Sequence, residues 1–169
     1  MSGKDIENLI KEQGLRIELG YGIPHQTTKG FVSMDSLAGA DIVQDIDIFP
    51  WDLPDECASI VIASHIFQRI NPANKGFIRC IDEIWRILKP EGELMLSVPY
   101  AGSYAYYQDP TSCNPCNEST WAYFDPFAKG GLYTLYKPKP WKVEKCVFSV
   151  NGNMEVLMSK RLIDQSYGN

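Results

Sequence analysis

The sequence predicts a doubly wound, mostly parallel α/β sheet that ends in an antiparallel hairpin. Three observations predict this fold class. Short apolar runs stop at a glycine or an acid, a long amphipathic segment lies between two of these runs, and "NGN" separates the last two expected strands. The 169 residues suit one hydrophobic core, so we expect a single domain over 1–169.

The expected elements follow one another with short connections. A helix over 3–13 presents its apolar residues on one face. About ten residues separate the first two strands, and fewer separate the next two, whereas parallel neighbours usually need about a dozen. We therefore expect a compact fold with shortened early crossovers made of turns or loops. The expected strands are 15–19, 31–35, 40–46, 58–64 and 93–99, a helix spans 71–92 and stops at "KPEG", and 141–150 pairs with 154–160.

Composition and charge narrow the class of protein. Apolar residues make up 44% of the chain and charged residues 22%, and no apolar run approaches the roughly 20 residues that span a bilayer. The N-terminus lacks the basic-then-apolar order of a secretory signal, so we expect a soluble cytoplasmic protein. The net charge of −5 makes nucleic acid an unlikely partner and suits a cationic ligand. The oligomeric state stays open.

The five cysteines are an odd number and are scattered, which argues against a disulfide framework. Cys113 and Cys116 form a C-x-x-C pair, but a second ligand pair at zinc-site spacing is missing. We expect ordinary loop cysteines and no metal site, with metal binding or redox chemistry as the lesser alternative.

The ends of the first three expected strands carry a pattern typical of a nucleoside site. Gly20 and Gly22 let the backbone turn sharply and approach a ligand closely. Asp35 ends the second strand, where a carboxylate can accept both ribose hydroxyls. Asp45 ends the third, where a carboxylate can accept from the exocyclic amino group of adenine. Because such ends meet at one edge of a sheet, we predict a ligand that contains adenosine.

The sequence lacks the motifs that bind the phosphate groups of a dinucleotide. His25 stands where G-x-G-x-x-G has its third glycine, and "GYGIPHQTTKG" lacks the G-K-[ST] ending of a P-loop. A nicotinamide-dependent oxidoreductase is therefore disfavoured. S-adenosylmethionine has no phosphate and carries positive charge, which suits Glu18 beside the glycines.

These motifs resemble those of small class I S-adenosylmethionine-dependent methyltransferases of the type-11 kind. "ELGYG" resembles the acid-x-G-x-G motif, "MDS" the ribose-binding acid and "QDID" the acid near adenine. The stretches 49–70 and 81–100 resemble the family's later motifs, so the resemblance covers about residues 15–100. It implies a Rossmann-like fold and S-adenosylmethionine as cofactor.

The resemblance also implies roles for individual residues. His65 would lie beneath the sulfonium, although a hydrogen-bonded structural histidine is an equally good interpretation. The implied cofactor-binding residues are Glu18, Leu19, Gly20, Tyr21 and Gly22 at the methionine end, Asp35 and Ser36 at the ribose, Asp45 and Ile46 at the adenine, and Ser64 and His65 at the sulfonium.

The expected activity is methyl transfer to a small-molecule or sugar-like acceptor by in-line displacement. Alignment supplies most of the help this reaction needs. If a general base is used, the candidates are His65, Tyr100 and Asp109. The aromatic segment 100–127 is either a substrate lid or a cover over the sheet. An inactive protein that binds cofactor or a partner is the alternative, because Gln68, Arg69 and Ser112 replace residues common in the family.

Overall fold

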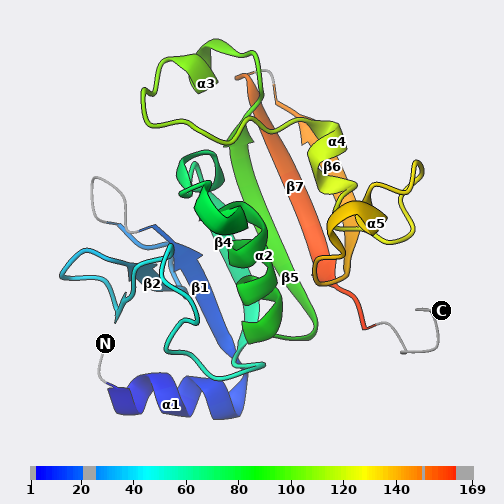
Figure 1. Cartoon of the computed structure of the whole chain (residues 1–169). Helices are drawn as coiled ribbons and strands as arrows, with labels where there is room; N and C mark the ends of the chain where they lie inside the picture. Colours follow the sequence, from blue (N-terminus) through cyan, green and yellow to red (C-terminus); the bar gives the residue numbers. More distant parts are fainter. Residues whose placement is uncertain (1–2, 21–25, 150, 163–169) are drawn as a thin grey trace.

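The structure, a computed structural model, describes residues 3–20, 26–149 and 151–162. In this part of the chain the strands form one seven-stranded sheet in the order β3-β2-β1-β4-β5-β7-β6 (Figure 1). The strands are β1 (Leu15–Leu19), β2 (Val32–Asp35), β3 (Ile42–Val43), β4 (Ala58–Ser64), β5 (Leu88–Pro99), β6 (Trp141–Phe148) and β7 (Asn153–Lys160). The helices are α1 (Gly3–Glu12), α2 (Gly76–Ile87), α3 (Tyr104–Tyr107), α4 (Glu118–Trp121) and α5 (Tyr133–Tyr136), with 3₁₀ turns η1 (Phe67–Arg69) and η2 (Ala73–Lys75).

The direction of the strands confirms the predicted fold class. β1 pairs in parallel with β2 and β4, and the parallel pairing continues to β3 on one side and to β5 on the other. β7 runs antiparallel to both β5 and β6, which is the predicted hairpin. The chain moves outward from β1 to β3 and then returns to β4, so the order of the strands reverses between β1 and β4. Ligands of open α/β sheets bind outside the carboxyl ends of the strands at such a point.

The early crossovers are short, as expected. The described residues between β1 and β2, and all those between β2 and β3, contain no helix. The second connection is closed by side chains, because both the backbone nitrogen and the hydroxyl of Ser33 donate to Asp41 Oδ2 at 3.1 Å. A carboxylate therefore holds this turn together where a longer crossover would have its own backbone hydrogen bonds.

Three predicted elements have different bounds in the structure. The strand expected over 40–46 is reduced to β3, since Asp41 at one end is bonded to Ser33 and the chain turns after the other end. The helix expected over 71–92 is α2 alone. Asn74 and Lys75 have positive φ angles, which prevent an earlier start, and Leu88 is already extended. β5 consequently begins at Leu88 and not at residue 93.

The core lies between the sheet and α2, which runs along β4 and β5 (Figure 1). Ile84 of α2 and Leu94 of β5 are fully buried, and Leu96 is 3% exposed. Met95 lies between the two leucines, points to the opposite face of the sheet and is 46% exposed. Central strands of parallel sheets are usually covered on both faces, so the face that carries Met95 is unusually open.

The segment 100–127 is partly a cover and partly exposed. Trp121 and Phe124 are each 1% exposed and pack beside Phe77 of α2, with ring centroids 6.2 and 6.1 Å away. This part completes the core. Tyr104 and Tyr107 of α3, by contrast, are 82% and 73% exposed, and Phe127 at the end of the segment is 60% exposed. The segment therefore carries exposed aromatic side chains at both of its ends. Among the described residues, none of the helices has the length and apolar character needed to cross a membrane.

Candidate active site

The carboxyl ends of β1, β2 and β3 surround a hollow of about 220 Å³. Gly20 follows β1, Asp35 ends β2, and Asp45 lies two residues beyond β3. The prediction that these three residues converge on one hollow is therefore confirmed. The described residues that line it are Gly20, Asp35, Ser36, Asp45, Ile46, Asp47, Ile66 and Arg69.

Gly20 lets the chain leave β1 beside the hollow. Its backbone nitrogen still donates to Met34 O of β2 at 2.9 Å, and its φ of +87° lies in the region that glycine adopts at little cost. A Cβ on this residue would meet the side chain of Ile66, another residue of the lining. The glycine thus provides both the turn and the space.

Asp35 is held in place by the turn that follows β2. Its Oδ1 accepts a hydrogen bond from the backbone nitrogen of Leu37 at 3.0 Å and one from the hydroxyl of Ser36 at 3.3 Å. These bonds fix the carboxylate at the edge of the hollow. A carboxylate at the end of the second strand can accept from the hydroxyls of a ribose.

Asp45 and Ile46 present unused hydrogen-bonding groups next to each other. Asp45 Oδ1 accepts from the backbone nitrogen of Asp47 at 2.9 Å, whereas Oδ2 has no hydrogen-bond partner in the described part of the chain. The backbone N–H of Ile46 is also unpaired among those residues. An acceptor beside a donor matches the edge of adenine that carries the 6-amino group and N1.

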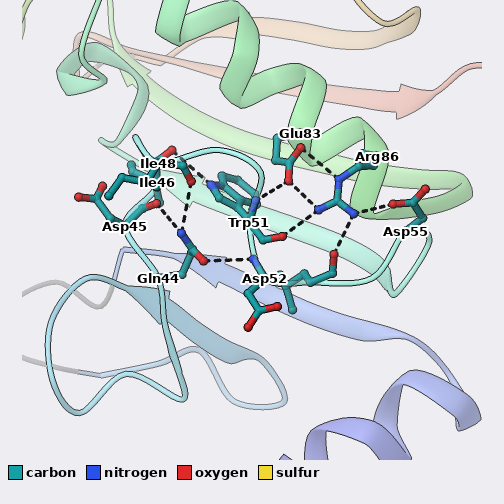
Figure 2. A network of polar contacts seen from close by, with 10 residues as sticks. Gln44, Asp45, Ile46, Ile48, Trp51, Asp52, Asp55, Glu83 and Arg86 are labelled. Carbon is teal, nitrogen blue, oxygen red and sulfur yellow. Dashed lines mark hydrogen bonds and ion pairs between the residues drawn. The ribbon is translucent and has the colours of Figure 1, made fainter.

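The loop that carries these groups is fixed by side chains of its own residues (Figure 2). The buried indole of Trp51 donates from Nε1 to Ile46 O at 3.3 Å. Gln44 Nε2 donates to the carbonyl oxygens of Asp45 and Ile48 at 2.9 and 3.3 Å, while its Oε1 accepts from Asp52 N at 3.2 Å. The wall of the hollow is thus a braced loop without regular secondary structure.

Comparison with known proteins identifies the fold. The sequence matches no family model, and a search of curated proteins gives no match either. Among solved structures, a S-adenosylmethionine-dependent methyltransferase from Archaeoglobus fulgidus has a TM-score of 0.60 at 12% identity, over 93% of this chain and 90% of that one. The 16S rRNA (adenine(1408)-N(1))-methyltransferase of Catenulisporales acidiphilia has a TM-score of 0.60 at 11% identity, over 97% and 94%. The antibiotic-resistance methyltransferase Kmr has a TM-score of 0.60 at 10% identity, over 95% and 94%.

The chain has the class I methyltransferase fold. At these identities the likeness concerns the fold alone, so the roles of individual residues must be argued from this chain.

The predicted methionine end of the site is only partly described. Glu18 Oε2 accepts a hydrogen bond from Thr28 N at 2.6 Å, which ties the loop after residue 25 back to β1. Leu19 is 1% exposed and its side chain belongs to the core, so only its backbone can face a ligand. Tyr21 and Gly22 lie outside the described residues.

Ser64 is the last residue of β4 and His65 follows it, on the same edge of the sheet as the hollow but outside its lining. Ser64 is exposed. The backbone of His65 is strained, with a φ of 55°, and is held by a bond from its nitrogen to Ser97 O at 2.9 Å. The imidazole has no hydrogen-bond partner among the described residues, so nothing there supports the interpretation as a bonded structural histidine.

The other two candidate bases, Tyr100 and Asp109, are also outside the lining of the hollow. A hydrogen bond with Glu118 raises the pKa of Tyr100 above its ordinary value. The hydroxyl and backbone nitrogen of Thr111, 2.7 and 2.9 Å from Asp109 Oδ1, hold the pKa of that carboxyl below its ordinary value. Neither shift favours proton removal from an acceptor at neutral pH.

Cys113 and Cys116 lie on the loop before α4. Cys113 is exposed, and its thiol donates to Ile70 O at 3.2 Å. Burial raises the pKa of Cys116 to about 12, so its thiol stays protonated at neutral pH. The described residues contain no group of three or more His, Cys, Asp or Glu side chains able to hold a metal ion.

Sequence reasoning missed three residues of the lining: Asp47, Ile66 and Arg69. Asp47 shares the segment "QDID" with Asp45, and its Oδ1 accepts from Asn71 N at 3.1 Å, which joins the two sides of the hollow. Arg69 was noticed only as a departure from the family pattern. Its guanidinium donates to His65 O at 2.9 Å, and this bond places it over the hollow. The spacing of four residues between His65 and Arg69 was the available signal.

Proposed function

We propose that this chain binds S-adenosylmethionine in the hollow lined by Gly20, Asp35 and Asp45 and transfers its methyl group to a small-molecule acceptor. The observation that carries the proposal is the convergence of these residues at the switch point of a class I methyltransferase fold. In the proposed complex Asp35 holds the ribose, and Asp45 with the Ile46 N–H holds the adenine.

The groups present fit this cofactor better than a dinucleotide. Asp45 Oδ2 and the Ile46 N–H, which have no hydrogen-bond partner among the described residues, complement the edge of adenine, and the space beside Gly20 would be filled by a Cβ. Glu18 and the acids of the lining place negative charge near a ligand that carries a sulfonium and an ammonium group. Between β1 and β2, the described residues 20 and 26–31 form no helix whose N-terminus could receive a pyrophosphate.

The bound cofactor would supply an activated methyl group, and the protein would supply alignment. Holding an acceptor against a fixed donor can lower the barrier by about 7–11 kcal/mol. His65 follows β4 on the same edge of the sheet as the hollow, and it is the base candidate whose side chain has no hydrogen-bond partner among the described residues. The exposed Tyr104 and Tyr107 offer flat surfaces for an aromatic or sugar-like acceptor.

A small acceptor fits the charge of the chain better than a large nucleic acid. One of the structurally similar proteins acts on 16S rRNA by its name, but this chain has 21 acidic residues against 16 basic ones. A protein that binds RNA through its phosphates needs an excess of positive charge at the interface.

Binding and turnover test the two halves of the proposal separately. Calorimetry with S-adenosylmethionine and with S-adenosylhomocysteine should show one site, whereas NAD should not bind. Incubation with labelled S-adenosylmethionine and a panel of small aromatic and sugar acceptors should then transfer label. Binding without any transfer would favour the alternative, an inactive protein that retains the cofactor site. No binding of either compound would reject the proposal as a whole.

A further inference from the structure

The adenine side of the hollow is attached to α2 through two charged residues that do not line it. Glu83 and Arg86 lie one turn apart on α2, and both point toward the loop that follows Asp45 (Figure 2). Glu83 is only 9% exposed, and its Oε1 accepts a hydrogen bond from the backbone nitrogen of Trp51 at 2.7 Å. A buried carboxylate is costly unless its partners are well placed, so this contact is a specific one.

Arg86 uses all five of its N–H donors on this loop and on Glu83. Nε and Nη2 donate to Glu83 at 3.1 and 2.6 Å, and Nη2 also reaches Trp51 O at 3.2 Å. Nη1 donates to Leu53 O at 2.8 Å and to Asp55 Oδ1 at 2.6 Å. The planar guanidinium therefore fixes the direction of the chain from Trp51 to Asp55, which a lysine could not do.

The connection continues from Trp51 to the groups that face the hollow. The backbone of Trp51 is held by Glu83 and Arg86, and its indole holds Ile46 O at 3.3 Å. In the part of the chain that the structure describes, neither the N–H of Ile46 nor Oδ2 of its neighbour Asp45 has a hydrogen-bond partner. Two bonded steps thus join α2 to the edge of the hollow across a segment that contains no helix and no strand.

We propose that Glu83 and Arg86 are positioning residues. They hold Asp45 and Ile46 where these residues can hydrogen-bond to the adenine of the cofactor, and so determine selectivity for adenine over other bases. The inference rests on the proposed function, because it assigns the ligand edge that this loop reads. It adds a role for two residues of α2 that contact neither the hollow nor its ligand.

Selectivity between two purines tests this role more directly than affinity alone. S-Inosylhomocysteine differs from S-adenosylhomocysteine in having a carbonyl oxygen in place of the 6-amino group and a protonated N1, so it opposes both Asp45 Oδ2 and the Ile46 N–H. Calorimetry of the wild-type chain should show S-adenosylhomocysteine binding more tightly. Arg86→Met should weaken S-adenosylhomocysteine by about tenfold or more and bring the ratio of the two dissociation constants toward one, since the loop loses its register.

Arg161→Met is the matched control. The side chain of Arg161 is 24% exposed against 25% for Arg86, and it too pairs with a carboxylate, that of Asp125. It lies just beyond β7, remote in the sheet order from β1 to β3, so its loss should leave both dissociation constants and their ratio at the wild-type values. Arg86→Lys keeps the positive charge but loses the planar set of N–H donors. We therefore expect its ratio of the two dissociation constants to stay close to that of Arg86→Met and not to return to the wild-type value.

The outcomes separate the two proposals. If the wild-type chain binds S-adenosylhomocysteine and Arg86→Met has the same ratio of dissociation constants, the positioning role is overturned and the proposed function stands. If Arg86→Met does not fold, an unchanged ratio in Arg86→Lys and Glu83→Gln has the same meaning. A wild-type chain that binds neither compound would reject both. If the ratio of the two dissociation constants falls as much in Arg161→Met as in Arg86→Met, the change reflects a general loss of stability, and this result also overturns the inference.

Discussion

A Cβ placed on Gly20 would lie 2.5 Å from Cδ1 of Ile66. Gly20 directly follows β1, and Ile66 lies two residues beyond β4. Both residues line the hollow, so they approach each other at its wall. The terminal methyl of an isoleucine can move, but Ile66 lines the hollow, so a side chain at position 20 would have to displace part of its wall. The glycine is therefore required by the hollow as well as by the backbone.

Gly20→Val should abolish binding of S-adenosylhomocysteine while leaving a folded chain. The φ of +87° disfavours any residue with a Cβ by about 1–2 kcal/mol, and the branched side chain would occupy the hollow. Calorimetry measures the binding, and urea unfolding measures the stability. Gly130→Ala is the control, because Gly130 has a φ of +97° and open space around its Cβ position. It should lose similar stability and keep its affinity; a Gly20→Val chain that binds normally would contradict this account.

Asp35→Asn should weaken S-adenosylhomocysteine by about tenfold, which corresponds to about 1.4 kcal/mol for a charge-assisted bond. Asparagine retains an oxygen that can accept from the Leu37 nitrogen, so the turn after β2 should survive. The loss then reports the ligand contact and not the turn. Asp35→Ala removes both and should be weaker still. An unchanged dissociation constant for both variants would mean that Asp35 serves only the turn.

Much of the sheet and of the hollow was predictable because local signals agree with the fold. The apolar runs that end at Gly20 and Asp35 became β1 and β2, and the acids at strand ends reached one hollow because parallel strands share an edge. The short crossovers followed from simple counting. These features depend on residues close together in the sequence.

The rest depended on contacts between distant residues. The third strand is shorter than its apolar pattern suggests because Asp41 bonds to Ser33 across the sheet edge. The bond between Glu83 and Trp51 N joins residues that are 32 apart in the chain, and one partner is a backbone group that has no sequence signature. The spacing of Glu83 and Arg86 on one helix was visible, but it fits an ordinary surface ion pair equally well.

Neighbouring residues of β5 should respond very differently to truncation. Leu96 is 3% exposed, and Leu96→Ala should lower the free energy of unfolding by about 2–5 kcal/mol because it leaves a cavity in the core. Met95 is 46% exposed on the other face, and Met95→Ala should change it by less than about 1 kcal/mol. Urea unfolding of both variants provides the comparison. A large loss for Met95→Ala would indicate that this face is covered in solution.

The titration of the half-buried carboxyl of Asp82 should contribute to the pH dependence of stability, and Asp82→Asn should remove that contribution. Burial raises the pKa of Asp82 above its ordinary value of 3.8, although Lys139 N donates to its Oδ1 at 2.7 Å. The folded chain thus binds this proton more tightly than the unfolded chain, and the stability linked to it falls as pH rises from about 4 through the raised pKa. Asparagine can still accept from Lys139 N but does not titrate. The difference in unfolding free energy, variant minus wild type, should therefore increase with pH over this range. A flat or decreasing difference in urea unfolding at pH 4 to 7 would show that the carboxyl is not destabilised by its burial.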